Sequence, residues 1–286
     1  MATNMGTVRR RLLGGELRRA RESAGRKAEE TAAHLECSMS KISRIENGMS
    51  PVKARDVRDL LEWYGVTDPA QVKAVMQLHK DAQEQGWWEP YEDQLPSGMA
   101  TYAGFECEAV ALRAYEPMFV HGLLQTEDYA RAVISAANPS QAETVENLVR
   151  FRMQRQQVQA ERDEPVQLWV VLEESTLRRP VGGREVMAAQ IEHLITAAAR
   201  PDVTLQIMPS AKGAHAAMAG AFALMEFAAA IPTVIYIDSI AGNLYLEKER
   251  EVRAFAQTFD LVRAAGPDPQ ETPATLQTIA REMRTP

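Results

Sequence analysis

The sequence has few cysteines and no long hydrophobic run. Its 286 residues include two cysteines, Cys37 and Cys107, which lie far apart and outside any CxxC spacing. This excludes a disulfide framework and a four-thiolate zinc site. No stretch approaches the roughly 18 to 20 consecutive apolar residues that a membrane span requires. The first residues, MATNMGTVRRRLLGGELRRA, lack the apolar core of a secretory signal, so we expect a cytoplasmic protein that does not engage a membrane.

The signatures of common enzymes are also missing. The sequence contains no HExxH, GxSxG or GxxxxGK motif, and no GxGxxG follows a predicted strand. We therefore predict that the protein is not an enzyme and that it uses neither a cofactor nor a metal ion.

Three groups of polar residues nevertheless leave a ligand site open. A helix that begins at Gly182-Gly183 beside several arginines could hold an anion at its N-terminus. A histidine in a loop rich in Gly and Ala could act as a sensor or a base, and acids at strand ends could line a pocket. The ordinary alternatives are a solvated loop, a structural histidine and solvated acids. The residues concerned are Arg178, Arg179, Arg184, His215, Glu173, Glu174 and Asp238.

Charge is distributed unevenly along the chain. The first 66 residues hold 13 basic and 9 acidic side chains, a balance of +4, whereas the remainder holds 19 basic and 30 acidic ones, a balance of -11. The N-terminal part therefore suits a polyanion, and the rest favours contact with protein.

The pattern of apolar residues predicts an α+β protein in three parts. Residues 1–85 are expected to form an all-α domain of five helices, 86–105 an ordered connector, and 106–286 a mixed α/β domain with a sheet of about five strands. We expect residues 106–115 to be helical. Strands are predicted at 166–175, 203–210, 221–227 and 233–239, with a weaker one at 243–249. The predicted helix 183–199 between the first two strands indicates a parallel pair.

A helix, a short turn and a second helix within residues 27–47 have the arrangement of a helix-turn-helix. In the second helix Ile42 and Ile45 are predicted to face inward, and the short or polar side chains face outward. Such a helix can enter the major groove of DNA. The alternative is a five-helix bundle that binds protein through the same surface. The outward residues are Met39, Ser40, Lys41, Ser43 and Arg44.

Residues 13–66, and above all CSMSKISRIENG followed by SPV, resemble the Xre/Cro-type helix-turn-helix regulators. The resemblance implies that Met39, Ser40 and Arg44 read bases of double-stranded operator DNA. It further implies that Ser38, Lys41, Ser43 and Asn47 touch phosphates or neighbouring bases. By the same resemblance, Glu46 pairs with Arg21 and holds the reading helix at its angle.

Two positions depart from the family pattern, and the basic N-terminus allows two interpretations. Glu36 occupies the turn position that is often glycine, so the turn is expected to be strained or reshaped. Lys27 occupies the cap position that is usually Ser, Thr or Asn, and it could reach a phosphate instead. Arg9–Arg11 are either a solvated disordered tail or an arm that contacts the minor groove or phosphates.

Residues 100–280 resemble the C-terminal domain of a large family of actinobacterial, antitoxin-like transcriptional regulators. Five signatures carry the resemblance in order: EAVALRAYEPMFVHGLLQTEDYARAVI, RFRMQRQ, LEESTLRRPVGG, QIMPSAKGAH and GAFALMEF. His121 stands where that family usually has proline. The resemblance implies a role in development or specialised metabolism and a very small partner protein encoded nearby.

These patterns together predict a sequence-specific transcriptional regulator that binds operator DNA as a homodimer. The alternative is an antitoxin-like protein that mainly binds the small partner protein, with DNA binding as autoregulation. A third class, an enzyme fused to a DNA-binding module, would require a reactive or metal-binding cluster that the sequence does not display.

Overall fold

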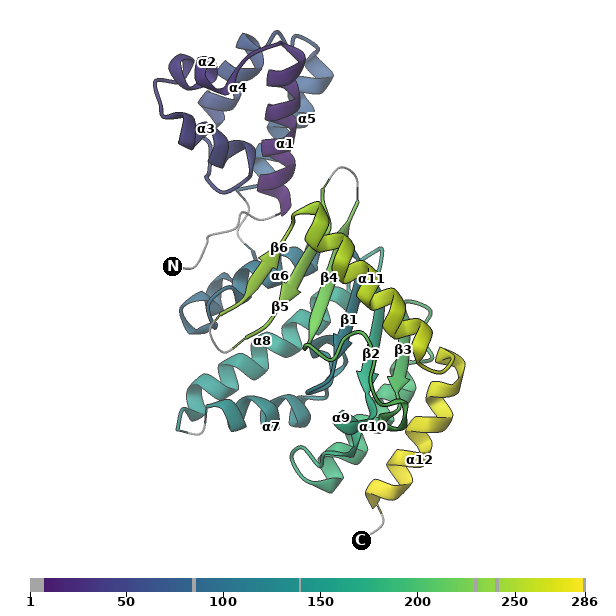
Figure 1. Cartoon of the computed structure of the whole chain (residues 1–286). Coiled ribbons are helices and arrows are strands. Elements are labelled where there is room, and N and C mark those ends of the chain that lie inside the picture. The colour runs from purple at the N-terminus through teal and green to yellow at the C-terminus, as the bar shows by residue number, and fades with distance from the viewer. Residues whose placement is uncertain (1–7, 84–85, 139, 229–230, 240–241, 285–286) are drawn as a thin grey trace. The chain divides into compact units, whose positions relative to one another are not determined.

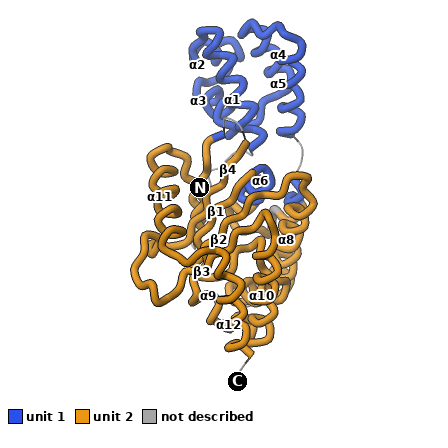
Figure 2. The backbone as a smooth tube through the Cα atoms, turned by 90° about the vertical axis from the view of Figure 1, so that its right-hand side faces the viewer, with its two compact units in different colours: residues 1–89, 100–108, 229–231 blue, residues 90–99, 109–228, 232–286 orange. Residues whose placement is uncertain are grey.

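The computed structural model describes residues 8–83, 86–138, 140–228, 231–239 and 242–284 (Figure 1). Its contacts divide the chain into two compact units (Figure 2). Unit 1 comprises residues 1–89, 100–108 and 229–231, and unit 2 comprises the rest. None of the helices described is both long and apolar enough to cross a membrane.

Unit 1 is helical. Its core is built from the apolar stripes of successive helices, with Leu17, Ile45, Val57 and Leu60 each at most 3% exposed. Asp68 caps the fifth helix by accepting a hydrogen bond from the N–H of Ala70 at 3.1 Å. The helices are α1 (Val8–Ser23), α2 (Ala28–His34), α3 (Met39–Glu46), α4 (Ala54–Trp63), α5 (Pro69–Asp81) and α6 (Met99–Glu108).

Unit 2 contains a mixed six-stranded sheet in the order β3-β2-β1-β4-β5-β6. The first three strands are parallel to one another, and β4, β5 and β6 continue the sheet with antiparallel pairs. The parallel β2–β3 pair with α10 (Arg184–Ala197) between its strands confirms the predicted strand-helix-strand arrangement. The strands are β1 (Ala109–Glu116), β2 (Gln167–Glu173), β3 (Val203–Met208), β4 (Phe222–Phe227), β5 (Val234–Ile237) and β6 (Leu244–Leu246).

The prediction of a helix over residues 106–115 is wrong beyond Glu108. Three alanines in β1, at positions 109, 111 and 114, give this segment good local helix propensity, which favoured that interpretation. Instead, Ala114 lies opposite Val170 of β2 and Ala223 of β4. Burial between two neighbouring strands outweighs the local preference, because both neighbours bring apolar side chains to the pleated surface.

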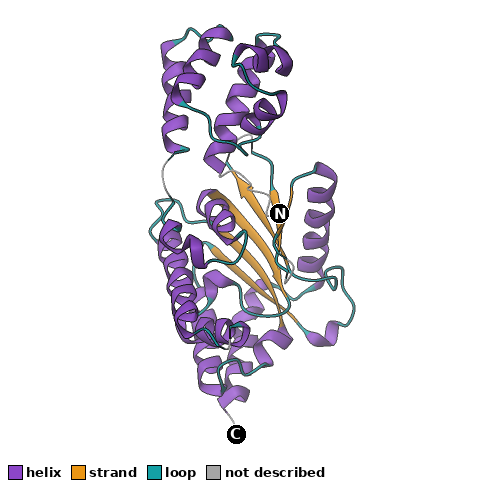
Figure 3. Cartoon of the chain, turned by 90° about the vertical axis from the view of Figure 1, so that its left-hand side faces the viewer, coloured by secondary structure: helices purple, strands orange, loops and turns teal. Residues whose placement is uncertain are grey.

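Helices cover both faces of the sheet. Figures 2 and 3 show α11 (Glu249–Ala265) on one face and α8 (Ala142–Ala160) on the other. Phe259 and Val262 of α11 pack with Leu224 and Ile235 of the sheet in one apolar cluster, and all four are fully buried. The other helices are η1 (Glu89–Gln94), η2 (Gly122–Leu124), α7 (Glu127–Ala137), α9 (Glu174–Arg178), η3 (Ser210–Lys212), η4 (Pro269–Glu271) and α12 (Thr272–Arg284).

Two titratable groups of unit 2 have pKa values far from their ordinary ones. Burial raises the pKa of Glu116, at the end of β1, to about 8, and the charge of Asp238 adds to the effect while that of Arg152 opposes it. Burial, with the charges of Arg155 and Arg152, lowers the pKa of His121 to about 3. Near pH 6.5, therefore, the folded protein holds Glu116 protonated and His121 neutral.

These shifts predict a pH dependence of stability. Glu116 binds its proton more tightly in the folded protein than in the unfolded chain. Its contribution to the free energy of unfolding therefore declines as pH rises from about 4.5 through 8. The effect of His121 on stability has the opposite pH dependence, since its contribution to the free energy of unfolding is lost as pH falls from about 6.5 through 3. Only the Glu116 effect remains above pH 6.5, where the free energy of unfolding should fall by up to about 2 kcal/mol by pH 8.

Urea unfolding of the full chain at pH 6.5 and 8 measures this loss. Glu116→Gln should remove most of it, because the amide does not titrate. Glu249→Gln changes a carboxylate that is 87% exposed and should leave the loss in place. An equal loss in Glu116→Gln and the unmodified chain would contradict the assignment.

Candidate DNA-binding surface

The turn between α2 and α3 is a tight, hydrogen-bonded reversal. The N–H of Cys37 donates to the carbonyl of Ala32 at 2.9 Å and that of Glu36 to Ala33 at 3.2 Å, so the two bonds close the end of α2. Glu36 has φ of +49°, the left-handed conformation that favours glycine. The strain expected at this position is therefore confirmed.

Glu36→Gly is expected to stabilise the protein by about 0.5 to 1 kcal/mol. Glycine removes the steric cost of a left-handed side chain, about 1 to 2 kcal/mol, and its greater freedom in the unfolded chain offsets part of the gain. Chemical unfolding measures the change. Glu29→Gly, at an exposed position inside α2, is the matched control and should destabilise by about 1 kcal/mol. A loss of stability in both variants would refute the strain at Glu36.

The N-termini of α2 and α3 are both capped, but by different groups. The hydroxyl of Ser38 accepts a hydrogen bond from the N–H of Lys41 at 3.2 Å and caps α3. At the start of α2 the ammonium of Lys27 cannot accept such a bond. The carboxylate of Glu30 instead accepts from the backbone N–H of Lys27 at 2.8 Å. The side chain of Lys27 is therefore exposed and unused by the cap.

Helix α3 has one buried and one exposed face. On the inner face, Ile42 and Ile45 are only 2% and 3% exposed, so this face packs into the interior of unit 1. Met39, the largest apolar side chain on the outer face, is 54% exposed. The division of faces agrees with the one that the sequence predicts. The other exposed residues of the motif are Ser38, Ser40, Lys41, Ser43, Arg44 and Asn47.

The charged groups on this face are available to a ligand. Within the part of the chain that the structure describes, no side chain pairs with the ammonium of Lys41 or the guanidinium of Arg44. The amide of Asn47, by contrast, donates to the carbonyl of Ser43 at 2.8 Å and so closes the last turn of the helix. Two free cations on a rigid helix form a surface that attracts phosphates and base acceptors.

An ion pair holds α3 against α1. Arg21 Nε lies 2.6 Å from Glu46 Oε1 and Arg21 Nη2 lies 3.0 Å from Glu46 Oε2, a bidentate arrangement. The side chains are only 11% and 9% exposed. Arg21 also donates to the carbonyl of Arg26 at 2.9 Å, which ties the end of α1 to the same pair. Glu46, in the last turn of α3, is thereby fixed to α1.

Two glycines let α1 and α3 approach closely. A Cβ atom at Gly14 would lie 2.5 Å from the carbonyl oxygens of Ile45 and Glu46, closer than any side chain can sit. Gly48 follows α3 with φ of +71°, and a Cβ there would lie 2.7 Å from the backbone N of Arg11. The ion pair and these contacts together leave α3 little freedom to tilt.

Arg9–Arg11 form neither a disordered tail nor an arm. All three lie within the first turns of α1 and are partly buried. Arg9 Nε donates to the carboxylate of Glu108 at 2.7 Å, and the guanidinium of Arg11 lies 4.8 Å from the ring centre of Phe105. The disordered tail and the extended arm are therefore both wrong, because these residues are helical, and Arg9 and Arg11 contact α6. Residues 1–7 lie outside the described part of the chain.

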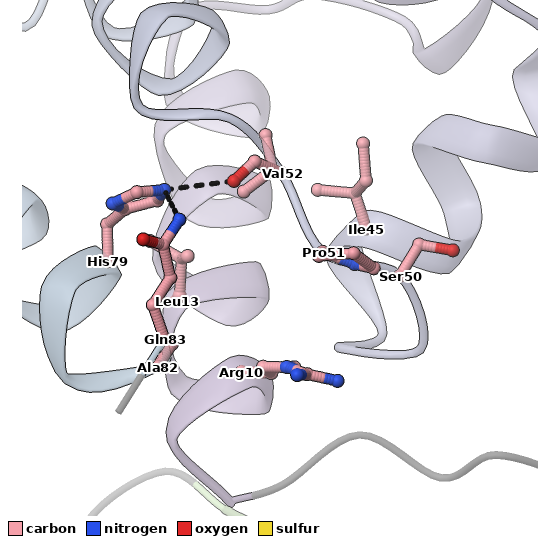
Figure 4. A pocket seen from close by; sticks show the side chains of 9 residues that line it. All are labelled: Arg10, Leu13, Ile45, Ser50, Pro51, Val52, His79, Ala82 and Gln83. Carbon is pink, nitrogen blue, oxygen red and sulfur yellow. Dashed lines mark hydrogen bonds between the residues drawn. The ribbon is translucent and has the colours of Figure 1, made fainter. Parts of the chain in front are cut away.

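A cavity beside α3 is too small for a ligand. It has a volume of about 40 Å³ and lies among α1, α5 and the segment that follows α3 (Figure 4). His79 Nε2 lies 2.9 Å from the carbonyl oxygen of Val52 and 3.0 Å from Gln83 Nε2. These contacts hold the buried Val52 just before α4, which begins at Ala54. A volume of this size holds about one water and no larger ligand.

At the predicted anion site beside Gly182-Gly183, each of the three arginines already has a partner among the described residues. Arg178 binds the carboxylates of Glu174 and Glu282, at 2.7 and 2.5 Å. The other two arginines donate to backbone carbonyls at 2.9 Å, Arg179 to Met118 and Arg184 to Met283. The geometry therefore favours the ordinary loop.

His215 has an acidic partner that its sequence neighbours do not reveal. Its Nε2 lies 3.0 Å from Glu173 Oε1, and the hydroxyl of Tyr115 donates to the same carboxylate at 2.9 Å. The three side chains are largely buried and tie the segment before β4 to the ends of β1 and β2. No group of three or more potential metal ligands occurs among the described residues.

Comparison with known families finds two matches. Residues 12–75 match a helix-turn-helix domain, and residues 99–278 match a family described as a domain of unknown function, DUF5753. No curated protein and no solved structure matches the chain.

Proposed function

We propose that this chain, which belongs to the DUF5753 family, is a sequence-specific transcriptional regulator that binds double-stranded operator DNA through α3. Its helix-turn-helix domain indicates DNA binding and regulation of transcription. The observation that carries the proposal is the exposed face of α3, where Lys41 and Arg44 are free while the opposite face is buried. We further propose that the chain is an Xre-type, antitoxin-like regulator of actinobacteria that acts in the cytoplasm, a proposal that the resemblance of residues 13–66 and 100–280 supports.

Each residue of the surface has a proposed role. Arg44 is the main reader, because a guanidinium can hold guanine O6 and N7 with two parallel hydrogen bonds. Met39 senses a thymine methyl or groove shape, and Ser40 contacts a base edge. The ion pair of Arg21 and Glu46 positions α3 without touching DNA. The proposed contacts to phosphates or neighbouring bases are Lys27, Ser38, Lys41, Ser43 and Asn47.

The regulator is proposed to act as a homodimer. One such domain buries a modest area on DNA, so two copies that read half-sites about one helical turn apart would reach useful affinity and specificity. Residues 1–85 would then bind DNA, 86–105 would connect, and 106–286 would dimerise or bind a partner without acting as an enzyme. A role in development or specialised metabolism belongs to the same proposal.

A second function rests on the charge balance. The chain beyond residue 66 carries a net -11, which disfavours DNA and favours a protein partner. The protein would then be antitoxin-like and mainly bind a small protein encoded nearby, with DNA binding as autoregulation. A stoichiometric small protein recovered with the tagged chain from its native host would support this function.

Selection of binding sites from random duplex DNA by the full chain tests the main proposal. The expected result is one enriched sequence with two-fold symmetry, whose half-sites are separated by about one helical turn or a multiple of it. Binding should weaken steeply as salt is raised. Enrichment of no sequence, with only salt-dependent binding to every duplex, would overturn sequence-specific recognition.

A further inference from the structure

Helix α11 forms an outer layer of unit 2 (Figure 2). On its inner side, Phe259 and Val262 are fully buried against the sheet. Its outer side is open to solvent and carries a large apolar side chain, that of Leu261, which is 54% exposed. Exposed residues recur there at spacings of three and four, so they form one stripe along the helix. The stripe consists of Arg250, Ala254, Gln257, Leu261 and Ala264.

An open pocket of about 520 Å³ adjoins this stripe. One wall is α11 itself, through Ala254, Phe255 and Thr258, and the other is the segment 216–222 before β4. Phe222 and Phe255 meet edge to face with ring centres 5.1 Å apart, and the small side chain of Ala254 leaves the space beside them open. The pocket is therefore an apolar recess that reaches the exposed side of the helix.

The wall opposite α11 is anchored. Segment 216–222 follows His215, whose Nε2 lies 3.0 Å from Glu173 Oε1. The N–H of Ala217 donates to His215 Nδ1 at 3.3 Å, and Ala217 is only 2% exposed. A wall that is fixed before binding lowers the entropy that an occupant must overcome, so the pocket is preformed.

Leu261 and the pocket can complement each other across a two-fold axis. Leu261 follows Ala254 by seven residues, which is about two helical turns. In two antiparallel copies of α11, such an axis would pass between Gln257 and Thr258. Leu261 of each copy would then lie level with Ala254 of the other and could enter its pocket. A two-fold contact of this kind occurs twice, and each time an apolar side chain leaves water for an apolar recess.

The charges beside the stripe fit the same arrangement. Arg253 and Asp260 are seven residues apart and therefore lie on the same side of α11. In the antiparallel pair, Arg253 of each copy comes close to Asp260 of the other. Within one chain, Arg253 pairs with Glu249 and Asp260 with Arg263, between side chains that are 41% to 87% exposed. Surface pairs of this kind contribute little, so they can be exchanged for pairs between the two copies.

We propose that the exposed side of α11 and its pocket form the homodimer interface, with a second copy of this chain as the occupant. Leu261 of each copy fills the pocket of the other, and the charges of Arg253 and Asp260 fix the antiparallel register. The inference rests on the homodimer of the proposed function and adds the surface and the register that build it.

Sedimentation equilibrium of the full chain without DNA tests the interface through the dissociation constant of the dimer. Leu261→Asp should raise this constant at least about 100-fold, since each dimer carries the change twice and burial of one leucine contributes about ten-fold or more. Met118→Asp is the matched control, because Met118 is 56% exposed in the segment between β1 and η2. It should change the constant by less than about two-fold.

An exchange of charges tests the register. Arg253→Glu and Asp260→Arg each place like charges opposite one another and should each raise the dissociation constant about ten-fold. The double variant restores opposite charges across the axis, so its constant should return to within about three-fold of that of the unmodified chain. If the effects of the two changes simply multiply in the double variant, the two side chains do not meet and the register is wrong.

Native mass spectrometry of the same preparations identifies the occupant. A complex of two chains is the expected result. A single chain, whether free or carrying a small apolar ligand or another protein, overturns the interface and the proposed homodimer together. If Leu261→Asp dimerises as well as Met118→Asp, the homodimer stands and only this interface is wrong. Selection of DNA sites by the full chain decides operator recognition separately.

Discussion

Replacing Glu46 by alanine is expected to destabilise unit 1 by about 3 kcal/mol. The change leaves the Arg21 guanidinium unpaired in a site where its side chain is 11% exposed, and breaking one partner of a buried pair typically costs about 3 to 5 kcal/mol. The lower value is expected because neither side chain is fully buried, and because Arg21 retains its bond to the carbonyl of Arg26. Hydrogen exchange at the α3 amides of the full chain measures the loss where it occurs.

A double-mutant cycle separates the pair from its surroundings. Arg21→Met with Glu46→Ala removes both charges, so the double variant should be less destabilised than the sum of the two single changes. Glu16→Ala is the control, because the pair of Glu16 with Arg19 lies at the surface of the same helix; it should cost less than about 1 kcal/mol. Additive losses across the cycle would show that the two side chains do not stabilise each other.

Arg44→Ala is expected to reduce affinity for the selected operator by about 5- to 150-fold. This range corresponds to the 1 to 3 kcal/mol that a bidentate arginine-guanine contact contributes to discrimination. Affinity for unrelated duplexes should change far less, so the preference at one base pair of each half-site disappears. Arg44→Lys should not restore it, because an ammonium lacks the planar pair of donors. Fluorescence anisotropy with operators substituted at single base pairs measures both effects.

Lys41→Ala provides the comparison for Arg44. A lysine that contacts phosphate contributes equally to binding of all sequences, so its loss should reduce the affinity for every duplex by a similar factor. The slope of log affinity against log salt concentration should fall by about one. The stability of both variants should remain near that of the unmodified chain, since both side chains are exposed. If Arg44→Ala kept its base preference, α3 would not read DNA through this residue.

Helix α3 was predictable because its signals are local. The spacing of Ile42 and Ile45, the cap at Ser38 and the glycine at position 48 all lie within a dozen residues. The left-handed turn at Glu36 could be expected for the same reason, since the family pattern names the position where a glycine usually stands.

The missed features all depend on residues far apart in the sequence. β1 is a strand because of neighbours that follow much later, whereas its own composition favours a helix. His215 has an acidic partner because the fold brings it to Glu173, and no motif joins the two positions. The strand-end position of Asp238 indicated a pocket, but only the packing of α11 supplies the apolar wall.

The central position of β1 also determines the order in which the two units can fold. Helices α1 to α5 all lie within the first 81 residues, and small helical arrangements fold quickly. β1 must wait for both neighbours, since Tyr115 lies opposite Val171 of β2 and Phe222 of β4. During synthesis the apolar edges of β1 and β2 stay open until β4 has emerged, which exposes them to aggregation. The helix-turn-helix can therefore be complete while β1 of the larger unit still lacks a neighbour.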